Sequence, residues 1–222
     1  MARDESKAAL YEQFARVGKA LSNPVRLELL DLLAQGERSV EDLAEAAGMR
    51  LSNTSAQLKV LAQAGLLTTR RAGTRVFYRV ADTQVDVLVG QLKELARKRL
   101  ADVERAAQEY LGDVDALEPV SLAELAARTD AGDLVILDVR PPEEFNSAHI
   151  PAAINIPLDQ LASRLTDLPK DAHIVAYCRH RYCVLAPQAV RILRDHQYDA
   201  RPLDGGIPEW RQAGFKLSQQ AH

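Results

Sequence analysis

Both cysteines of the chain lie in one short stretch, residues 177–183, which reads YCRHRYC. Four side chains separate Cys178 from Cys183: Arg179, His180, Arg181 and Tyr182. An apolar run typical of a strand precedes Cys178, and a helix-like run follows Cys183. A strand-to-helix loop directs backbone N–H groups and the positive end of the helix toward its own residues, and arginines add charge. Such surroundings lower the pKa of a thiol, so the spacing predicts a nucleophilic thiolate at Cys178.

Two roles are open to Cys183. One is to pack under the following helix as a small apolar side chain, which is the common fate of a free cysteine. The other is to resolve a sulfenic acid or a persulfide on Cys178, because a curled loop brings residues five positions apart close together. The residues by themselves leave both roles open.

Two competing chemistries of a cysteine loop fit this stretch less well. Cysteine-dependent phosphatases carry an arginine six positions after the nucleophile, and here that position is Val184. A metal would need Cys178, His180 and Cys183 as ligands. Two adjacent arginines oppose a bound cation, and three ligands on one short loop seldom close a tetrahedral site. We therefore expect no metal and no other cofactor.

The composition is that of a globular protein that stays in the cytosol. The 222 residues are enough for two ordinary domains, with 47% hydrophobic and 27% charged residues. No apolar run approaches the roughly 20 residues that span a bilayer, and the N-terminus has no apolar core of the secretory kind. We expect no membrane contact. In the cytosol thiols stay reduced, which favours a reactive cysteine pair over a structural disulfide.

Positive charge is concentrated in one window of the first half. Residues 1–112 carry 17 Lys+Arg against 15 Asp+Glu, and residues 113–222 carry 11 against 16. No acidic residue occurs between Glu45 and Asp82. Six basic residues fall inside that window: Arg50, Lys59, Arg70, Arg71, Arg75 and Arg79. The window is typical of a face that binds a polyanion, and a solvated basic face without a partner is the alternative.

The first half has the periodicity of helices followed by a hairpin. Predicted helices span residues 7–20, 24–34, 40–48, 52–65 and 83–111, and predicted strands span 66–71 and 75–80. Asn23-Pro24 and Ser39 are expected caps, and Ala72-Gly73-Thr74 suits the turn. This order describes a winged helix-turn-helix. The stretches LSNPVRLELL, QLKVLAQAGLL and RRAGTRVFYRV resemble the ArsR-type winged-helix repressors across roughly residues 9–110.

The resemblance implies a mainly α winged domain that binds double-stranded operator DNA as a homodimer. Its second motif helix would enter the major groove with exposed residues at its N-terminal part: Arg50, Ser52, Asn53, Thr54, Ser55 and Gln57. Phosphates would be held by Lys59, Arg70, Arg71 and Arg75. Helix capping is the alternative role for the residues from Ser52 to Ser55, whereas Leu58, Val60 and Leu61 are expected in the core.

The apolar side of residues 83–111, extended by Leu10 and Phe14, is the expected dimer surface. Packing of that helix against the second half of the chain is the alternative. Metal-sensing relatives carry a cysteine pair before the readout helix or histidines in the last helix. Here residues 39–48 contain no cysteine and residues 83–111 contain no histidine, so those sites are absent.

The second half alternates strands and helices after a polar linker at residues 113–119, which predicts an α/β domain with a mostly parallel sheet. Its motifs LDVRPPEEFNSAHIPAAINIP, YCRHRYC and LDGGIPEW resemble a rhodanese domain over residues 120–216. The resemblance implies that Cys178 takes sulfur from a small donor, such as thiosulfate or a persulfide, and holds it as Cys–S–SH. Arg179 and Arg181 would assist, with His180 and Tyr182 in the active-site loop.

Asp138 and Arg140 end the first predicted strand of this half. Arg140 either supports the active-site loop electrostatically or forms an ordinary strand-end ion pair with Asp138. Gly205-Gly206 is expected to allow a close backbone approach near the sulfur site. His180 stands where the family often has glycine, so turnover with thiosulfate is left open.

Together these features predict a winged helix-turn-helix domain at residues 1–112, a linker at 113–119 and a rhodanese-like domain at 120–222. The preferred hypothesis is a DNA-binding transcriptional repressor whose rhodanese domain senses or transfers reactive sulfur. The alternative is a sulfurtransferase enzyme that uses the winged helix for dimerisation or docking. The acid-free window favours the first, because an enzyme needs no such window.

Overall fold

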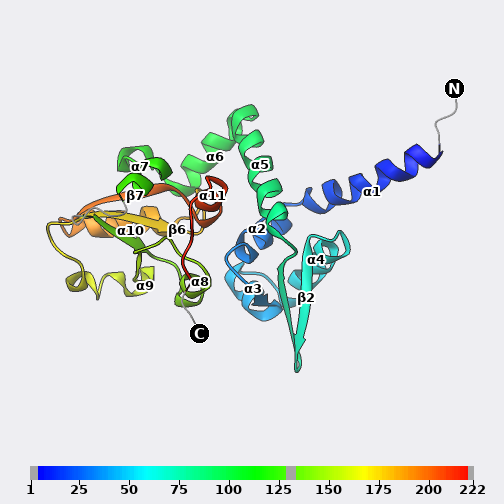
Figure 1. Cartoon of the computed structure of the whole chain (residues 1–222), viewed down its shortest axis with the longest axis horizontal. Coiled ribbons are helices and arrows are strands. Elements are labelled where there is room, and N and C mark those ends of the chain that lie inside the picture. The colour runs from blue at the N-terminus through cyan, green and yellow to red at the C-terminus, as the bar shows by residue number, and fades with distance from the viewer. Residues whose placement is uncertain (1–4, 129–133, 220–222) are drawn as a thin grey trace. The chain divides into compact units, whose positions relative to one another are not determined.

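The computed structural model describes residues 5–128 and 134–219. The chain forms two compact units, Met1–Val89 and Gly90–His222. Helix α5 (Thr83–Arg99) crosses this division (Figure 1). Its first part, with Val85 and Val89 in the core, belongs to the first unit, and residues 90–99 belong to the second. The domain boundaries at residues 112 and 120 stay a prediction.

The first unit is the predicted set of helices and hairpin. Its remaining elements are α1 (Glu5–Leu21), α2 (Pro24–Leu33), β1 (Arg38–Ser39), α3 (Val40–Ala46), α4 (Leu51–Gln63), β2 (Leu67–Ala72) and β3 (Arg75–Val80). The three strands form an antiparallel sheet in the order β1-β3-β2. The β2–β3 hairpin is the wing, and it projects from the helices (Figure 1).

Local signals place these elements as expected. The Asn23 side chain accepts a hydrogen bond from the Arg26 N–H at the start of α2, and Ser39 and Asp42 form a capping box on α3. Ala72 pairs with Arg75 across the wing turn, where Gly73 has a φ of 61°. Residues that carry a side chain rarely adopt a positive φ, so the turn favours glycine.

The core of the first unit is built from the apolar faces of α2, α3 and α4. Leu29, Leu43, Leu58 and Leu61 are fully buried there, and Tyr78 of β3 covers them. Val60 is an exception to the predicted core, since it is 38% exposed on the outer side of α4. Leu58 and Leu61 point into the core from one side of α4, and the helical turn places Val60 on the other side. The prediction that Val60 belongs to the core is therefore wrong.

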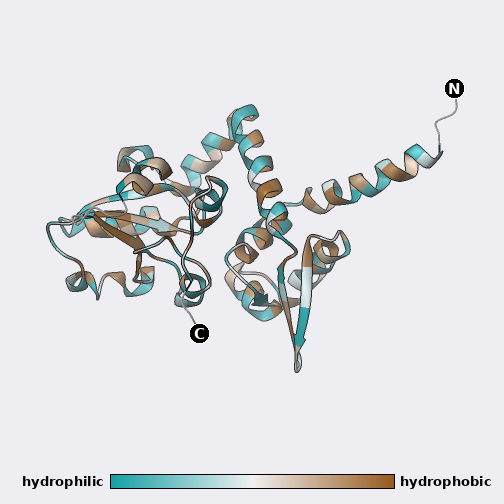
Figure 2. Cartoon of the chain, viewed as in Figure 1, coloured by the Kyte–Doolittle hydropathy of each residue, from teal (hydrophilic) through white to brown (hydrophobic). Residues whose placement is uncertain are grey.

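Apolar side chains also remain uncovered on α1 and α5. Phe14 is 63% exposed, and Leu10, Leu88 and Leu95 are exposed as well. In Figure 2 hydrophobic and hydrophilic bands alternate along α1, as expected of a helix with one apolar side.

The single helix predicted over residues 83–111 is wrong, because the chain forms α5 and a separate helix α6 (Ala101–Leu111). Leu100 between them is extended, with φ −115° and ψ 105°. The charges suit an end and a new start at this point. The last turn of α5, at the negative end of its dipole, carries Arg97, Lys98 and Arg99. The first turn of α6, at the positive end of its dipole, carries Asp102 and Glu104.

The second unit has a parallel sheet in the order β5-β4-β6-β7. Its elements after α6 are a 3₁₀ turn (Asp115–Leu117), α7 (Leu122–Arg128), β4 (Leu134–Asp138), α8 (Pro142–Ser147), β5 (Ile154–Asn155), α9 (Leu158–Leu161), a second 3₁₀ turn (Leu165–Asp167), β6 (His173–Cys178), α10 (Leu185–Asp195), β7 (Asp199–Gly206) and α11 (Ile207–Gln212). The mostly parallel sheet is confirmed.

Alternation along the strands supplies a core on each face of this sheet. Ile174 and Ala176 of β6 face a core with α9 and α10, whereas Val175 and Tyr177 face a second core with α7 and α11. The central strands are hydrophobic as a result (Figure 2). None of the helices in the described ranges combines the length and the apolar character needed to cross a membrane.

Candidate functional site

The cysteine loop connects the carboxyl end of β6 to the first turn of α10. Cys178 is the last residue of β6, and α10 begins at Leu185. Inside the loop the Tyr182 N–H donates to Nδ1 of His180 at 3.2 Å, and the Cys183 N–H donates to the His180 carbonyl at 3.0 Å. The loop curls tightly, as predicted, and it buries both sulfur-bearing residues. Cys178 is 1% exposed and Cys183 is 7% exposed.

The two thiols lie close together and differ in acidity, and the Cys178 thiol donates to the Cys183 carbonyl oxygen at 3.4 Å. Burial raises the pKa of Cys178 well above its usual value, whereas the interaction with the Cys178 side chain lowers the pKa of Cys183 to about 7. Backbone N–H groups of Arg179 and Leu185 also lower the pKa of Cys183. The pair thus supplies one thiolate near neutral pH, at Cys183. This differs from the expectation that Cys178 has the lowered pKa.

Burial is the main cause of this difference, and both loop arginines are also engaged with carboxylates. The Arg179 guanidinium makes a two-pronged contact with Glu144, with Nη2 2.7 Å and Nε 2.9 Å from Oε1. Glu144 is itself buried, at 2% exposure. Arg181 Nη1 lies 2.8 Å from Oδ1 of Asp204. The arginines hold the loop in shape, and the carboxylates compensate part of their charge, while the charge of Arg179 still lowers the pKa of Cys183.

A close backbone contact fixes the other side of the loop. A Cβ on Gly206 would lie 2.5 Å from the carbonyl atoms of Arg179 and 2.6 Å from the Cys178 oxygen. Glu209 completes the contact, because its carboxylate accepts hydrogen bonds from the Gly206 N–H at 2.9 Å and the Arg181 N–H at 3.4 Å. The expected close approach at Gly205-Gly206 is therefore present, and Gly206 makes it.

Asp138 and Arg140 form a fully buried ion pair beside this loop. Arg140 Nη2 lies 2.6 Å from Asp138 Oδ2 and donates to the Ala148 carbonyl at 2.7 Å. The Asn155 side chain donates to the backbone carbonyls of both residues. Of the two predicted roles, the strand-end ion pair is present, and it joins β4 to β5 and to the end of α8.

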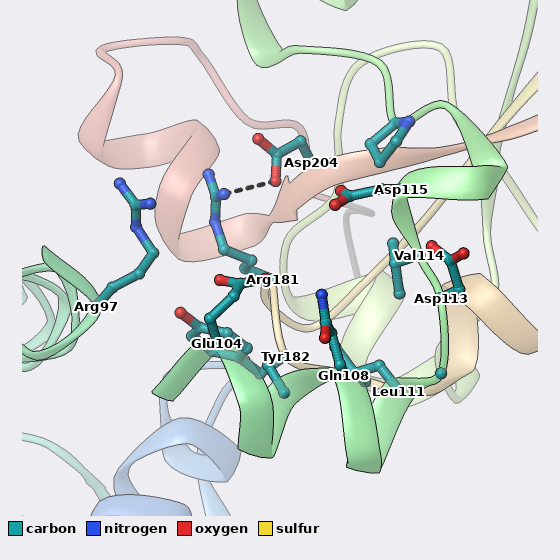
Figure 3. Close-up of a pocket in the computed structure, with 13 residues that line it drawn as sticks. Arg97, Glu104, Gln108, Leu111, Asp113, Val114, Asp115, Arg181, Tyr182 and Asp204 are labelled. Carbon is teal, nitrogen blue, oxygen red and sulfur yellow. Dashed lines mark ion pairs between the residues drawn. The ribbon is translucent and has the colours of Figure 1, made fainter. Parts of the chain in front are cut away.

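A cavity of about 230 Å³ lies on the outer side of the loop, between it and α6 (Figure 3). Arg181 and Tyr182 reach it from the loop, and Arg97 reaches it from α5. Glu104 and Gln108 of α6 line another wall. The C-terminus of α6 is tied to the same domain, since Arg191 of α10 donates to the Leu111 carbonyl at 2.9 Å. The cysteine loop and α6 are therefore neighbours within the second unit.

The N-terminal part of α4 presents polar side chains to solvent. Arg50, Ser52 and Asn53 are exposed, and Ser55 is partly exposed. Arg50 occupies the cap position, and no side chain caps this end of the helix, so capping does not account for the serines. The prediction for Thr54 is wrong, because it is fully buried and its hydroxyl donates to the Arg50 carbonyl at 3.2 Å.

Two other predicted DNA contacts are engaged inside the first unit. Gln57 accepts a hydrogen bond from Arg26 at 2.9 Å, which limits its reach toward a base. Arg70 pairs with Glu37, with Nε 3.2 Å from Oε1, and its guanidinium lies 4.6 Å from the centre of the Phe77 ring. Lys59, Arg71 and Arg75 are exposed. The half of β2 nearest the turn is hydrophilic in Figure 2.

Comparisons with known proteins identify the two domains that carry the cysteine loop and helix α4. Residues 121–213 match the rhodanese-like domain, and residues 21–70 match a helix-turn-helix domain. The HTH-type transcriptional regulator Rv0324 of Mycobacterium tuberculosis is 49% identical over 219 residues, which cover 99% of this chain and 96% of that protein. The chain belongs to the ArsR-type HTH regulators that carry a rhodanese-like domain.

Each half of this ArsR-type regulator also has relatives of its own. A sulfurtransferase of Allochromatium vinosum is 30% identical over 105 residues, which cover 47% of the regulator and 94% of that enzyme. The homodimeric winged helix-turn-helix DNA-binding domain Mb0332 of Mycobacterium bovis is 48% identical, with a TM-score of 0.42. That comparison covers 46% of the regulator and 94% of the fragment.

The regulator's predicted site residues fall into three groups. The cysteines lie together with Arg179, and the Asp138–Arg140 pair forms a separate cluster at the ends of neighbouring elements. The exposed members of the DNA-binding set lie on α4 and the wing. In the described ranges no group of three or more His, Cys, Asp and Glu side chains is arranged to hold a metal ion.

Sequence reasoning missed Glu144, Asp204 and Glu209, which hold the loop. The sequence did contain a signal for them, because each is an acidic residue within one of the rhodanese-like motifs, in the segment PEEF or in LDGGIPEW. Only the fold pairs them with the loop, since Glu144 precedes Arg179 by 35 positions.

Gly206→Ala should open the cysteine loop of the regulator. The new Cβ would overlap main-chain atoms that cannot rotate away, so the loop backbone must shift. We expect alkylation of the two cysteines by iodoacetamide under native conditions to become at least about tenfold faster, as local opening exposes them. Gly18→Ala, where a Cβ meets nothing within 4 Å, is the control. Equal rates in Gly206→Ala and wild type would contradict the close contact.

Glu144→Gln should shift the pH dependence of thiol alkylation downward. Without the carboxylate, the charge of Arg179 is less compensated and stabilises the thiolate, so the pKa of the pair falls by roughly one unit. At a pH below 7 alkylation is then faster than in wild type. Glu144→Asp keeps the charge, and Glu143→Gln removes an exposed neighbouring one. Neither should shift the profile, and an upward shift in Glu144→Gln would refute the role of Glu144.

Proposed function

We propose that this regulator is a homodimeric, DNA-binding repressor that responds to reactive sulfur through Cys178 and Cys183. The observation that carries the proposal is the presence, in one chain, of two buried neighbouring thiols and a helix, α4, whose N-terminal part is exposed. The first unit contains no cysteine, so a thiol-based signal must enter through the second.

The DNA-binding part rests on α4 and the wing. The uncapped N-terminus of α4 leaves backbone N–H groups for a phosphate, and Ser52 and Asn53 can reach base edges. Arg71 and Arg75 near the wing turn, with Lys59 of α4, would contact phosphates. Arg70 contributes less than predicted, because Glu37 already compensates its charge.

Dimerisation would cover the exposed apolar residues of α1 and α5. Leu10 and Phe14 lie on one side of α1, and Leu88 lies on α5. One winged helix reads a half-site, so a two-fold dimer gives an imperfect palindrome as the operator. Exposed apolar residues along two helices are typical of such an interface.

The sulfur chemistry starts from the thiolate of the pair. Transfer of the Cys178 proton to the Cys183 thiolate places the thiolate on Cys178, where it attacks the terminal sulfur of a persulfide donor, R–S–SH. The new S–S bond yields Cys178–S–SH, and the donor's S–S bond breaks. Its electron pair leaves with R–S⁻, which takes a proton from water. The step needs no oxidant.

Cys183 would then resolve the persulfide. Cys183 first releases to solvent the proton that it received, and its thiolate then attacks the Cys178 sulfur. A Cys178–Cys183 disulfide forms, and the outer sulfur leaves as HS⁻. The loop must change shape in this step, because the disulfide replaces a hydrogen bond. Arg181 and Tyr182 face α6, so the change would alter how α5 and α6 pack in the second unit. Helix α5 continues into the winged unit and would carry the effect there.

The alternative is a sulfurtransferase in which the winged helix serves only for dimerisation or docking. The similarity of the second half to a sulfurtransferase favours it. The two functions differ in one property, because only the repressor changes its affinity for DNA when sulfur is added.

Arg71→Ala combined with Arg75→Ala should weaken DNA binding equally on all sequences. Each lost phosphate contact lowers the steepness of log K against log salt by about 1. Binding to operator and unrelated DNA is measured at several salt concentrations. Arg164→Ala, an exposed ion-paired residue of the second unit, is the control. An unchanged salt slope in the double variant would show that the wing does not contact phosphates.

Polysulfide should lower the DNA affinity of wild type and leave Cys178→Ser unaffected. The operator is titrated with each protein before and after treatment, and mass spectrometry follows the Cys178–Cys183 peptide. Cys183→Ser should still take up the first sulfur but form no disulfide. A response that persists in Cys178→Ser, or no response in wild type, would refute the coupled sensor. Sulfur uptake without a change in affinity would support the sulfurtransferase.

A further inference from the structure

A second cavity, of about 340 Å³, lies against the inner side of the cysteine loop. Nine residues line it: Val139, Pro141, Pro142, Pro157, Leu158, Asp159, Gln160, Arg179 and Leu185. We call it the proline pocket. Its walls come from the segments that follow β4, β5 and β6, three neighbouring strands of the parallel sheet. In open α/β sheets, ligands bind at this carboxyl edge.

Neither cysteine lines the proline pocket, but two of its lining residues are neighbours of the sulfurs. Arg179 and Leu185 line it, and the backbone N–H groups of the same two residues act on the Cys183 sulfur. Leu158 and Leu185 also pack against the core cluster that contains both cysteines. A molecule in this pocket would therefore contact residues that flank the thiols and would reach Cys178 when the loop opens.

The walls suit an apolar molecule better than an inorganic anion. Three prolines, Val139 and two leucines make most of the surface. The only cation among the lining residues is Arg179, and Glu144 already compensates its charge. Asp159 at the rim repels anions further. A thiosulfate ion would find neither a free positive charge nor a good fit in a cavity of this volume.

We propose that the proline pocket holds the apolar body of an organic hydropersulfide, R–S–SH, and presents its terminal sulfur to Cys178. This inference rests on the proposed function and names the class of sulfur donor for that site. The Cys178 thiolate takes the terminal sulfur from R–S–SH, and R–S⁻ leaves into the pocket and takes a proton from water. Polar rim residues such as Gln160 would face the solvent side of the bound donor.

The experiment compares donors that differ only in the size of R. Full-length protein is mixed briefly with methyl or benzyl hydropersulfide, each released from a precursor, or with thiosulfate. Mass spectrometry then measures the rate at which Cys178 gains sulfur. We expect the benzyl donor to react at least about tenfold faster than the methyl donor, and thiosulfate to react slowest. Equal rates for the two organic donors, or a faster reaction with thiosulfate, would overturn the inference.

A matched pair of variants tests the pocket itself. Gln160→Trp places a large side chain at the rim and should remove the preference for benzyl over methyl. Gln188→Trp adds the same bulk at an exposed position of α10 outside the lining and should change neither rate. Benzyl methyl sulfide, which cannot transfer sulfur, should slow the benzyl donor in wild type but not in Gln160→Trp. A benzyl preference that survives in Gln160→Trp would refute the pocket.

The outcomes also separate this inference from the proposed function. If Cys178 gains sulfur without any preference for R, the pocket assignment fails and the sulfur chemistry stands. If the benzyl preference is found but sulfur uptake leaves DNA affinity unchanged, the pocket stands and the sensor fails. If no donor modifies Cys178, both are wrong.

Discussion

The buried ion pair of Asp138 and Arg140 is the constraint on which the second unit depends. Moving two charges out of water costs several kcal/mol for each ion unless pairing and hydrogen bonds offset it. Here the guanidinium contacts the carboxylate and the Ala148 carbonyl, and Asn155 binds the backbone of both residues. These contacts hold only when the ends of β4, β5 and α8 meet in one arrangement. Helix α8 carries Glu144, so the clamp on Arg179 and the shape of the cysteine loop follow from the same pair.

The two halves of the chain use their arginines in opposite ways. In the cysteine loop, Glu144 and Asp204 form ion pairs with Arg179 and Arg181, and the acidity of the thiols depends on their burial, on each other and on backbone N–H groups. On α4 and the wing, positive charge is left exposed, with Arg70 as the exception. The exposed positive charge of α4 and the wing is the surface that we expect to contact a polyanion.

Local patterns were enough to predict most elements and their order, because caps, the hairpin turn and strand alternation act between residues close in sequence. They were not enough for features decided by distant partners. Thr54 is buried because other helices cover that side of α4, and Arg179 is neutralised by a glutamate 35 positions earlier. The end of α5 at Leu100 left a signal in the charges around it, but unbroken apolar spacing favoured one long helix.

The near-complete burial of both sulfurs has a consequence for the time course of any response. A sealed thiol reacts only while the loop is open, so its observed rate is the open fraction multiplied by the intrinsic rate when closing is fast. A brief pulse of reagent would therefore modify few molecules, because the open fraction is small at any moment. A reagent that persists would modify more of them in proportion to its concentration and to time. The proposed sulfur response would then report the total exposure and not its momentary peaks.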